Sequence, residues 1–411
     1  LPVLLACAAL VMAALMLLAW LNVRGEDPLS PSSNANTPAQ IERGAYLARA
    51  GNCAVCHTAR GGAPYAGGKG IPTPFGTVFA GNLTPAATGL GDWTAAEFWR
   101  AMHHGRAKDG RLLYPAFPYP SFTLITREDS DALFAYLRSL PAVEQPPRQH
   151  ELRFPYNTQL ALAVWRALYF KPASFEPTQQ SDVLNRGAYL VQSLGHCAAC
   201  HASRNAMGAI AANDAMDGSM IAPQNWYAPP LGPINGDASA YAQTTFALLK
   251  NGITPHSSAK GLMAEVVSTS TQHLNDADLS AIAAYLSKLP SPKQASTPSS
   301  EPHLDTMKLG ASVYVKHCAD CHGKQGQGVA NIYPVLAGNR HVTQANTTNL
   351  LQIVKGGGFA PSTAANPRPY GMPPFAQTLK DDELAAVITY IRNSWGNRAS
   401  EVKALEAQFR K

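Results

Sequence analysis

Six of the seven cysteines stand in three copies of one pattern, in which two cysteines are separated by two residues and followed directly by a histidine. Two thiols one helical turn apart can add to the two vinyl groups of one porphyrin, and the histidine that follows can bind the iron. The pattern therefore predicts three covalently attached haems. Their attachment residues are Cys53, Cys56 and His57, then Cys197, Cys200 and His201, and finally Cys318, Cys321 and His322.

Other kinds of cysteine site explain this pattern less well. One copy alone would also suit a zinc site, a thioredoxin-like redox pair or structural disulfides. However, no second paired-ligand motif accompanies each copy to complete a zinc tetrahedron. Nor does any copy lie in the strand-rich sequence that is typical of thiol oxidoreductases. Three copies in one chain favour haem, with the three histidines as proximal iron ligands.

A haem that carries electrons usually has a second axial ligand, and a methionine raises the reduction potential relative to a histidine. Met372 lies in a proline-bounded loop ahead of the last predicted helix. Met263 occupies the comparable place in the second repeat, where a core-filling methionine is the alternative. We predict that both thioethers bind iron.

The first repeat has no methionine at this place, because Phe117 stands where it would be expected. The nearest donors are Met102, His103 and His104. We predict His103 as the ligand, which would give a bis-histidine haem of lower potential than its two neighbours. His104 and Met102 stay open. The alternative is that these histidines contact propionates or solvent, and that the iron has another ligand or an open position.

Helices must position these residues, since the sequence around each motif repeats as well. Each repeat ends in a segment with an acidic start, an aromatic residue and apolar residues at helical spacing. Thr37 before Pro38, and Thr94 three residues before Glu97, are typical helix N-termini. Glycine and proline are dense between the helices, and strand signals are few. The sequence therefore predicts an all-α fold.

Composition divides the chain into three haem domains and their connections. Two segments rich in serine, proline and asparagine or threonine are typical of flexible linkers. An apolar stretch of helical rhythm at 156–170 should pack within the chain, on a partner or on the membrane surface. The predicted parts are an anchor at 1–22, a linker at 23–38, haem domains at 39–145, 181–291 and 304–411, a connecting segment at 146–180, and a linker at 292–303.

The chain opens with 22 uncharged, mostly apolar residues, enough to cross a hydrocarbon core as a helix. A cleavable signal peptide has a shorter apolar region after a basic start, so we predict a retained anchor. Trp20 suits the headgroup layer, and Arg24 marks the return to water. Cys7 in this run is interpreted as a small apolar side chain. A lipidated cysteine is the alternative, although most of the apolar run follows it.

The overall composition excludes some functions. The 411 residues are 46% hydrophobic, which is enough for folded cores. The net charge of +6 is modest and scattered, so nothing indicates nucleic-acid binding. The chain has no glycine-rich dinucleotide fingerprint, and we find no catalytic residues for substrate oxidation.

These motifs, in this order, resemble the membrane-anchored three-haem cytochrome subunits of bacterial periplasmic dehydrogenases, which serve alcohol, aldehyde, gluconate and fructose dehydrogenases. The resemblance covers nearly the whole chain, from RGAYLARAGNCAVCH through LYPAFPYPSFT to MPPFAQTL. It implies three tandem cytochrome c domains behind an N-terminal transmembrane helix. It also implies that the chain relays electrons from a separate catalytic subunit to ubiquinone or a terminal oxidase, at the inner membrane with the haem domains in the periplasm.

The phenylalanine at position 117 bears on the partner. The cytochromes of alcohol dehydrogenases typically carry methionine there, whereas this form looks more like the cytochromes of molybdopterin-containing aldehyde or N-heterocycle dehydrogenases. We therefore expect an aldehyde- or alcohol-oxidising complex, with a molybdopterin partner favoured over a quinoprotein or a flavoprotein. Two other functions stay open: a peroxidase-like haem enzyme with an open first iron, and a free-standing electron shuttle.

Overall fold

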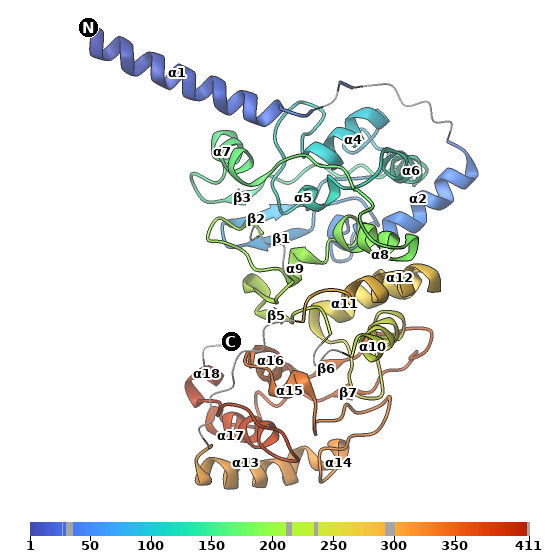
Figure 1. Ribbon diagram of the computed structural model, residues 1–411, viewed down its shortest axis with the longest axis vertical. Helices are drawn as coiled ribbons and strands as arrows, with labels where there is room; N and C mark the ends of the chain where they lie inside the picture. The colour runs from blue at the N-terminus through green and yellow to red at the C-terminus, as the bar shows by residue number, and fades with distance from the viewer. Residues whose placement is uncertain (27, 30–35, 211–215, 234–236, 292–300, 409–411) are drawn as a thin grey trace. The chain divides into compact units, whose positions relative to one another are not determined.

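The computed structural model describes residues 1–26, 28–29, 36–210, 216–233, 237–291 and 301–408 (Figure 1). Most of the predicted linker at 292–303, and part of the one at 23–38, lie outside these residues. The described chain is predominantly helical, as predicted, with a few short strands. It divides into two compact units, Leu1–Ala199 with Arg204–Ala215, and Cys200–Ser203 with Met216–Lys411. The division passes through the second cysteine motif.

The first unit contains the apolar N-terminal helix, the first repeat and the start of the second. Its helices are α1 (Pro2–Val23), α2 (Pro38–Ala50), α3 (Cys53–His57), α4 (Ala95–His104), α5 (Tyr119–Phe122), α6 (Arg127–Arg138), α7 (Gln159–Tyr169) and α8 (Asp182–Gln192). Its strands form one antiparallel sheet in the order β1 (Gly70–Thr73), β2 (Gly76–Phe79) and β3 (Glu151–Leu152).

The helix starts follow the capping chemistry expected from the sequence. The Thr37 side chain accepts a hydrogen bond from the Gln40 N–H at 3.2 Å. Thr94 and Glu97 form a reciprocal capping box at the start of α4. Gly105 ends α4 with a φ of 60°, a left-handed conformation that glycine adopts at little cost. These signals are local, so they are readable in the sequence.

The core of the first repeat lies where α2 crosses α6. The two backbones come so close that a Cβ added at Gly44 would lie 1.9 Å from the Ala132 carbonyl oxygen. Leu47 and Leu133, each 1% exposed, pack in the same cluster as Cys53 of the first cysteine motif. The first cysteine motif therefore packs against this helix crossing.

The second unit contains the rest of the second repeat and the whole of the third. Its helices are α10 (Ala238–Asn251), α11 (Gly261–Thr269), α12 (Asp276–Leu286), α13 (Leu304–His317), α14 (Ala319–His322), α15 (Arg340–Thr343), α16 (Thr348–Gly356), α17 (Asp381–Arg392) and α18 (Ala404–Gln408), with short 3-10 turns at Ala222–Gln224 and Thr271–His273. Two hairpins pair β4 (Ser219–Ile221) with β5 (Trp226–Ala228), and β6 (Gly358–Phe359) with β7 (Gly371–Met372). Helix α9 (Ala198–His201) spans the division between the units.

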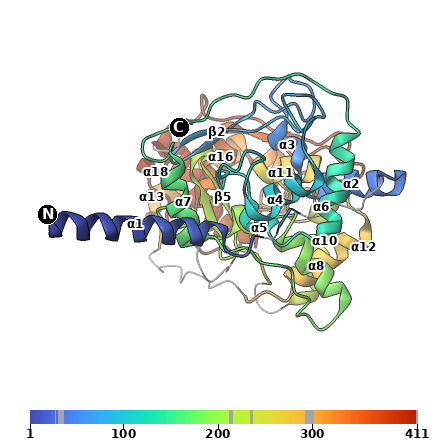
Figure 2. The same cartoon turned by 90° about the horizontal axis from the view of Figure 1, so that it is seen from above.

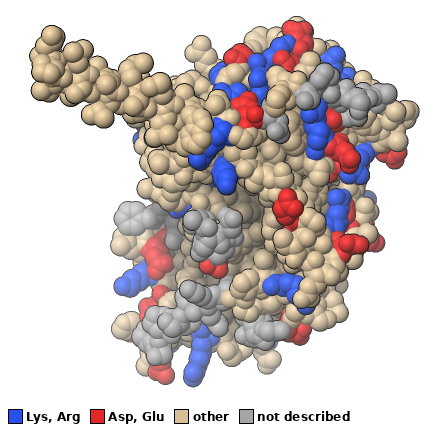
Figure 3. Space-filling view, turned by 45° about the horizontal axis from the view of Figure 1, so that its top comes forward, with Lys and Arg blue, Asp and Glu red and all other residues tan. Residues whose placement is uncertain are grey.

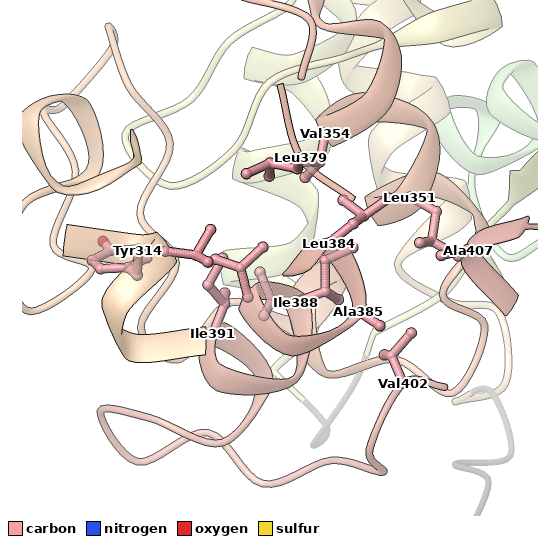
Figure 4. Close-up of a cluster of buried hydrophobic side chains, with 13 residues drawn as sticks. Tyr314, Leu351, Val354, Leu379, Leu384, Ala385, Ile388, Ile391, Val402 and Ala407 are labelled. Atoms are coloured by element: carbon pink, nitrogen blue, oxygen red, sulfur yellow. The ribbon is translucent and has the colours of Figure 1, made fainter. Parts of the chain in front are cut away.

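The third repeat builds its core as the first does. Helices α13 and α17 cross at Gly310, where an added Cβ would lie 2.2 Å from the Ala386 carbonyl oxygen. Figure 4 shows Leu384 and Ile388 of α17 pointing toward Leu351 of α16 and the other buried side chains of this cluster. Cys318 of the third motif packs against the same cluster. The first and third motifs therefore rest on the same kind of helix crossing.

Candidate haem sites

The three cysteine motifs lie on short helical turns. The first motif is α3, and α9 and α14 each begin after the first cysteine of their motif. Asn52 and His196, directly before the first two motifs, have φ angles of 51° and 36°, so the chain enters both turns through a left-handed residue. None of the seven cysteines, all within the described residues, forms a disulfide bond. Among the described residues, no three histidine, cysteine or acidic side chains lie together in a way that could hold a metal ion.

Each motif histidine is oriented by a backbone carbonyl. The Nδ1 atom of His57 lies 2.7 Å from the Gly81 carbonyl oxygen. The corresponding distance is 2.6 Å from His201 to Pro229 and 3.1 Å from His322 to Pro334. When Nδ1 carries the proton and donates it to a carbonyl, Nε2 keeps the lone pair that binds a metal.

A glycine N–H donates a hydrogen bond to the backbone carbonyl of each motif histidine. The N–H of Gly67 donates to the His57 carbonyl at 2.8 Å, that of Gly218 to His201 at 2.9 Å, and that of Gly328 to His322 at 2.8 Å. The φ angles of the three glycines are 80°, 89° and 60°. A Cβ on any of them would meet another residue of its own repeat at 2.4–2.5 Å.

Sequence reasoning did not find these glycines or the accepting carbonyls. The glycines follow their histidines by ten, seventeen and six residues, so no fixed offset links them to the cysteine motif. The only signal would have been a glycine in a turn-rich loop after each motif, and such loops contain many glycines.

Burial disfavours the charged form of the three motif histidines and of Cys53. It lowers the pKa of His57, His201 and His322, in the third case together with the charge of Lys260. It raises the pKa of the Cys53 thiol to about 12, with a further contribution from Cys56. A neutral imidazole with a fixed Nδ1–H is the form that binds iron, so the residues present fit a haem.

The predicted sixth ligand of the third site lies against the same core as its motif. Met372 is in β7, opposite Gly358 of β6, and packs on the cluster that also holds Cys318. Gly357, with a φ of 63°, allows this approach, because a Cβ there would lie 2.3 Å from the Met372 carbonyl oxygen. Met263, the prediction for the second site, is a partly buried residue in the first turn of α11.

In the first repeat, Phe117 occupies the place that Met372 has in the third. It packs on the cluster that contains Cys53, just as Met372 packs on the cluster that contains Cys318. Its ring also contacts Phe122 at a centroid distance of 5.4 Å. A phenyl ring has no donor atom for iron, so the first site needs a ligand from elsewhere or leaves a position open.

The three nearby donors of the first site lie in the last turn of α4 and are all buried. His103 is 6% exposed, and its ring stacks on Trp99 at a centroid distance of 4.3 Å. His104 is 1% exposed. Met102 is 5% exposed and belongs to the cluster that holds Cys53 and Phe117.

The chain is similar to several known proteins. The cytochrome c family model matches residues 41–141, 184–290 and 307–395. The chain is 40% identical to the cytochrome c subunit of the quinone alcohol dehydrogenase of Gluconacetobacter polyoxogenes, over 90% of this chain and 84% of that one. It is 37% identical to the gluconate 2-dehydrogenase cytochrome c subunit of Pantoea cypripedii, over 88% and 87%. It is 38% identical to one subunit of the nicotinate dehydrogenase of Pseudomonas putida, over 92% of this chain and 33% of that one.

The family matches span all three cysteine motifs and most of the described helices. Cytochrome c domains carry covalently bound haem c, and the relatives named as cytochrome c subunits of dehydrogenases support an electron-transfer role. The chain belongs to the cytochrome c family.

Proposed function

We propose that this chain is the electron-transfer subunit of a membrane-bound dehydrogenase and carries three haem c groups. The observation that carries the proposal is the threefold repetition at the motif histidines. In each copy a carbonyl accepts from Nδ1 and a glycine N–H donates to the histidine carbonyl. Electron transfer needs this kind of fixed, repeated setting, because the protein supplies orientation and potential while the haem supplies the one-electron chemistry.

The residue roles follow from the chemistry of the side chains. The paired thiols of the three motifs would form the thioether bonds to haem, and His57, His201 and His322 would supply the imidazoles that bind the iron. Met263 and Met372 complete the second and third sites. His103 completes the first site. The alternatives are His104 and Met102, and the Met102 thioether lies in the cluster that packs on Cys53.

The three sites then differ in potential. A histidine in place of a methionine lowers the potential of a haem, so the first haem is the most reducing of the three. Burial and nearby charges adjust the potentials further, as the charge of Lys260 near His322 would do at the third site. The electron relay therefore contains one haem whose potential is lower than that of the other two.

The chain works at the bacterial inner membrane. Of the described residues, one helix, α1, is long and apolar enough to cross a bilayer, and none of its residues is buried in the protein. It anchors the chain, with the haem domains in the periplasm, where c-type haem is attached. Electrons arrive from a catalytic subunit that oxidises an aldehyde or an alcohol, and they leave to ubiquinone or a terminal oxidase.

The partner is proposed to be of the molybdopterin type. Phe117 supports this choice over a quinoprotein or a flavoprotein, since that position distinguishes the two groups of cytochromes that the chain resembles. A nicotinate dehydrogenase subunit is among the relatives, at 38% identity. The identity to alcohol and gluconate dehydrogenase subunits is as high, so the choice rests on Phe117.

Two measurements test the proposal. The intact mass of the chain should show three haems, and replacing both cysteines of one motif by alanine should remove one of them. The control Cys7→Ala should remove none, because Cys7 lies in α1. Gentle detergent extraction should copurify a large catalytic subunit whose substrate reduces all three haems. Repeated isolation of the chain alone, or fewer haems, would contradict the proposal.

A peroxidase-like enzyme is the second candidate, and Phe117 is the observation in its favour because it leaves the first iron without a methionine. Cyanide distinguishes the two functions. Rapid binding of cyanide to one haem of the oxidised protein, with peroxide turnover, supports the haem enzyme. Slow or absent binding supports the electron relay.

A further inference from the structure

Helix α7 exposes apolar side chains along one face. Leu160, Val164 and Leu168 follow one another at intervals of four residues and are 59%, 43% and 66% exposed. The opposite face is buried, with Leu162 and Trp165 at 5% and 8% exposure. The helix is therefore apolar on both sides, and a soluble helix would carry polar residues on the exposed one.

This helix lies against the end of α1. The Asn22 side-chain amide donates to the Ala163 carbonyl at 3.0 Å, and the Arg166 Nε–H donates to the Asn22 side-chain oxygen at 3.2 Å. Figure 2 shows α7 beside the end of α1 nearest the body of this unit. The apolar face of α7 is thus continuous with the helix that is proposed to enter the membrane.

The chemistry at this junction matches a membrane surface. Helix α1 has no charged residue over its length, and Figure 3 shows its surface without Lys, Arg, Asp or Glu. Trp20, 58% exposed, marks the end of the apolar run, where indole rings favour the headgroup layer. Phe154 and Tyr169, 81% and 40% exposed, lie just before α7 and at its last residue. The exposed cations Arg153 and Lys171 flank the helix and suit anionic headgroups.

We propose that α7 lies in the headgroup layer of the bilayer that α1 crosses, with Leu160, Val164 and Leu168 among the first carbons of the lipid chains. Helices of this kind bury one face to a depth of about 5–10 Å. The proposal rests on the membrane anchoring by α1 that is part of the proposed function.

The helix would also hold the first haem site close to the membrane. Arg166, 3% exposed, donates to the His104 carbonyl at 2.7 Å, at the end of α4. The same guanidinium lies over the rings of Tyr119 and Phe170 at 5.3 Å and 4.7 Å from their centroids. One buried side chain thus joins the membrane-facing helix to the helix that carries His103.

Photoactivatable lipids test the proposal directly. The full haem-loaded chain is reconstituted in bilayers of phosphatidylethanolamine and phosphatidylglycerol that contain a lipid with a diazirine near the start of its acyl chain. After illumination, the adducts are mapped by mass spectrometry. We expect adducts on α1 and on Gln159–Tyr169. The double variant Leu160→Glu with Leu168→Glu should lower the α7 adducts roughly tenfold, because each carboxylate opposes burial in lipid.

The matched control is Val315→Glu on α13, a residue that is 70% exposed. It should leave the α7 adducts unchanged. Haem spectra and cooperative unfolding check that the variants fold, and Leu160→Gln with Leu168→Gln gives a second, uncharged pair.

Each outcome of the labelling separates the claims. Adducts on α1 without adducts on α7 overturn this inference alone, whereas their absence from both helices also overturns the anchoring. Adducts on α7 that disappear when the catalytic subunit is bound assign the face to that subunit and overturn the inference. Adducts that the glutamate pair does not reduce overturn it as well.

Discussion

In each motif histidine, one ring nitrogen already lies within hydrogen-bonding distance of a backbone carbonyl. In His57 the Nδ1 atom faces the Gly81 carbonyl, and His201 and His322 repeat the arrangement with prolyl carbonyls. The rotation of the imidazole plane is thereby fixed before iron binds, and the energy of ordering the ring is part of folding.

Met372, the proposed sixth ligand of the third site, gives the first prediction. Met372→His should lower the midpoint potential of one haem by on the order of 0.2 V, within the ~0.8 V that axial ligands span. The thioether favours ferrous iron more than an imidazole does. The near-infrared charge-transfer band of a methionine-bound ferric haem should lose the share that this one haem contributes. A spectroelectrochemical titration measures both, with Met307→Leu on α13 as the control. An unchanged potential would mean that another residue binds this iron.

The first site gives a prediction that separates its three candidates. His103→Leu should convert one haem to a high-spin form that binds cyanide, because leucine offers no donor. Met102→Leu and His104→Leu should leave the spin state unchanged. Low-temperature electron paramagnetic resonance of the oxidised protein reads the result. If Met102→Leu alone gives the high-spin signal, the thioether that packs with Cys53 is the ligand instead.

At the scale of elements, two helix crossings set the positions of the first and third motifs. Gly44 in α2 faces the Ala132 carbonyl of α6, and Gly310 in α13 faces the Ala386 carbonyl of α17. Both distances are too short to leave room for a methyl group on the glycine. The first and last helices of the first repeat therefore meet backbone to backbone, and so do those of the third repeat. This contact explains why both repeats have a glycine in the middle of a helix, a position that helix propensity alone would disfavour.

Substitution at the crossings should be costly. Gly44→Ala and Gly310→Ala should each lower the free energy of unfolding by about 1–3 kcal/mol, because the added methyl group forces the helices apart. Denaturant unfolding followed by circular dichroism and by the haem absorbance measures the loss. Each variant should lower the denaturant midpoint for the unfolding of one repeat only, since the two crossings belong to different compact units.

The control for this series is Gly356→Ala at the end of α16, where an added Cβ would meet nothing within 4 Å. It should raise the unfolding free energy by up to ~1 kcal/mol through the higher helix propensity of alanine. A loss at Gly356 equal to the loss at Gly44 would show that flexibility, rather than the close crossing, is responsible.

The elements were largely predictable from the sequence, whereas their contacts were not. The caps at Thr37 and Thr94, and the helices that begin and end each repeat, follow from local chemistry. The hairpins β1–β2 and β6–β7 were missed, because strands of two to four residues have no readable period. The stretch at 156–170 was recognised as helical, but its contact with Asn22 joins residues 141 positions apart. Such a contact depends on tertiary packing and leaves no local pattern.

At the scale of the whole molecule, one compact unit contains the C-terminal part of the second repeat and the whole third repeat, and polar side chains join the two there. The Asn349 side chain of α16 accepts from the Tyr227 N–H at 2.9 Å and donates to the Tyr227 carbonyl at 2.7 Å. It thus pairs with the edge of β5 as a neighbouring strand would. Gln352, one turn further along α16, donates to the Asn225 carbonyl at 3.0 Å.

These contacts matter because electron transfer slows steeply as the gap between two redox centres widens. The β5 strand leads directly into Pro229, whose carbonyl orients His201. Helix α16 ends at Gly356, next to the glycine that lies against Met372. The contact between α16 and β5 therefore links His201 of the second site to Met372, the predicted sixth ligand of the third, and we infer that it fixes their separation.

The last prediction follows from this link. Asn349→Ala combined with Gln352→Ala removes three hydrogen bonds to backbone groups, each worth about 0.5–1.5 kcal/mol, so the repeats should move more freely against each other. Electron exchange between the second and third haems should slow severalfold while both midpoint potentials stay unchanged, because neither iron loses a ligand. Photoreduction followed by transient absorption measures the exchange, and Gln408→Ala on the exposed surface is the control. A change in either potential would show that the contact between α16 and β5 acts on the haem environment, and an unchanged rate would show that the distance between the two haems is set elsewhere.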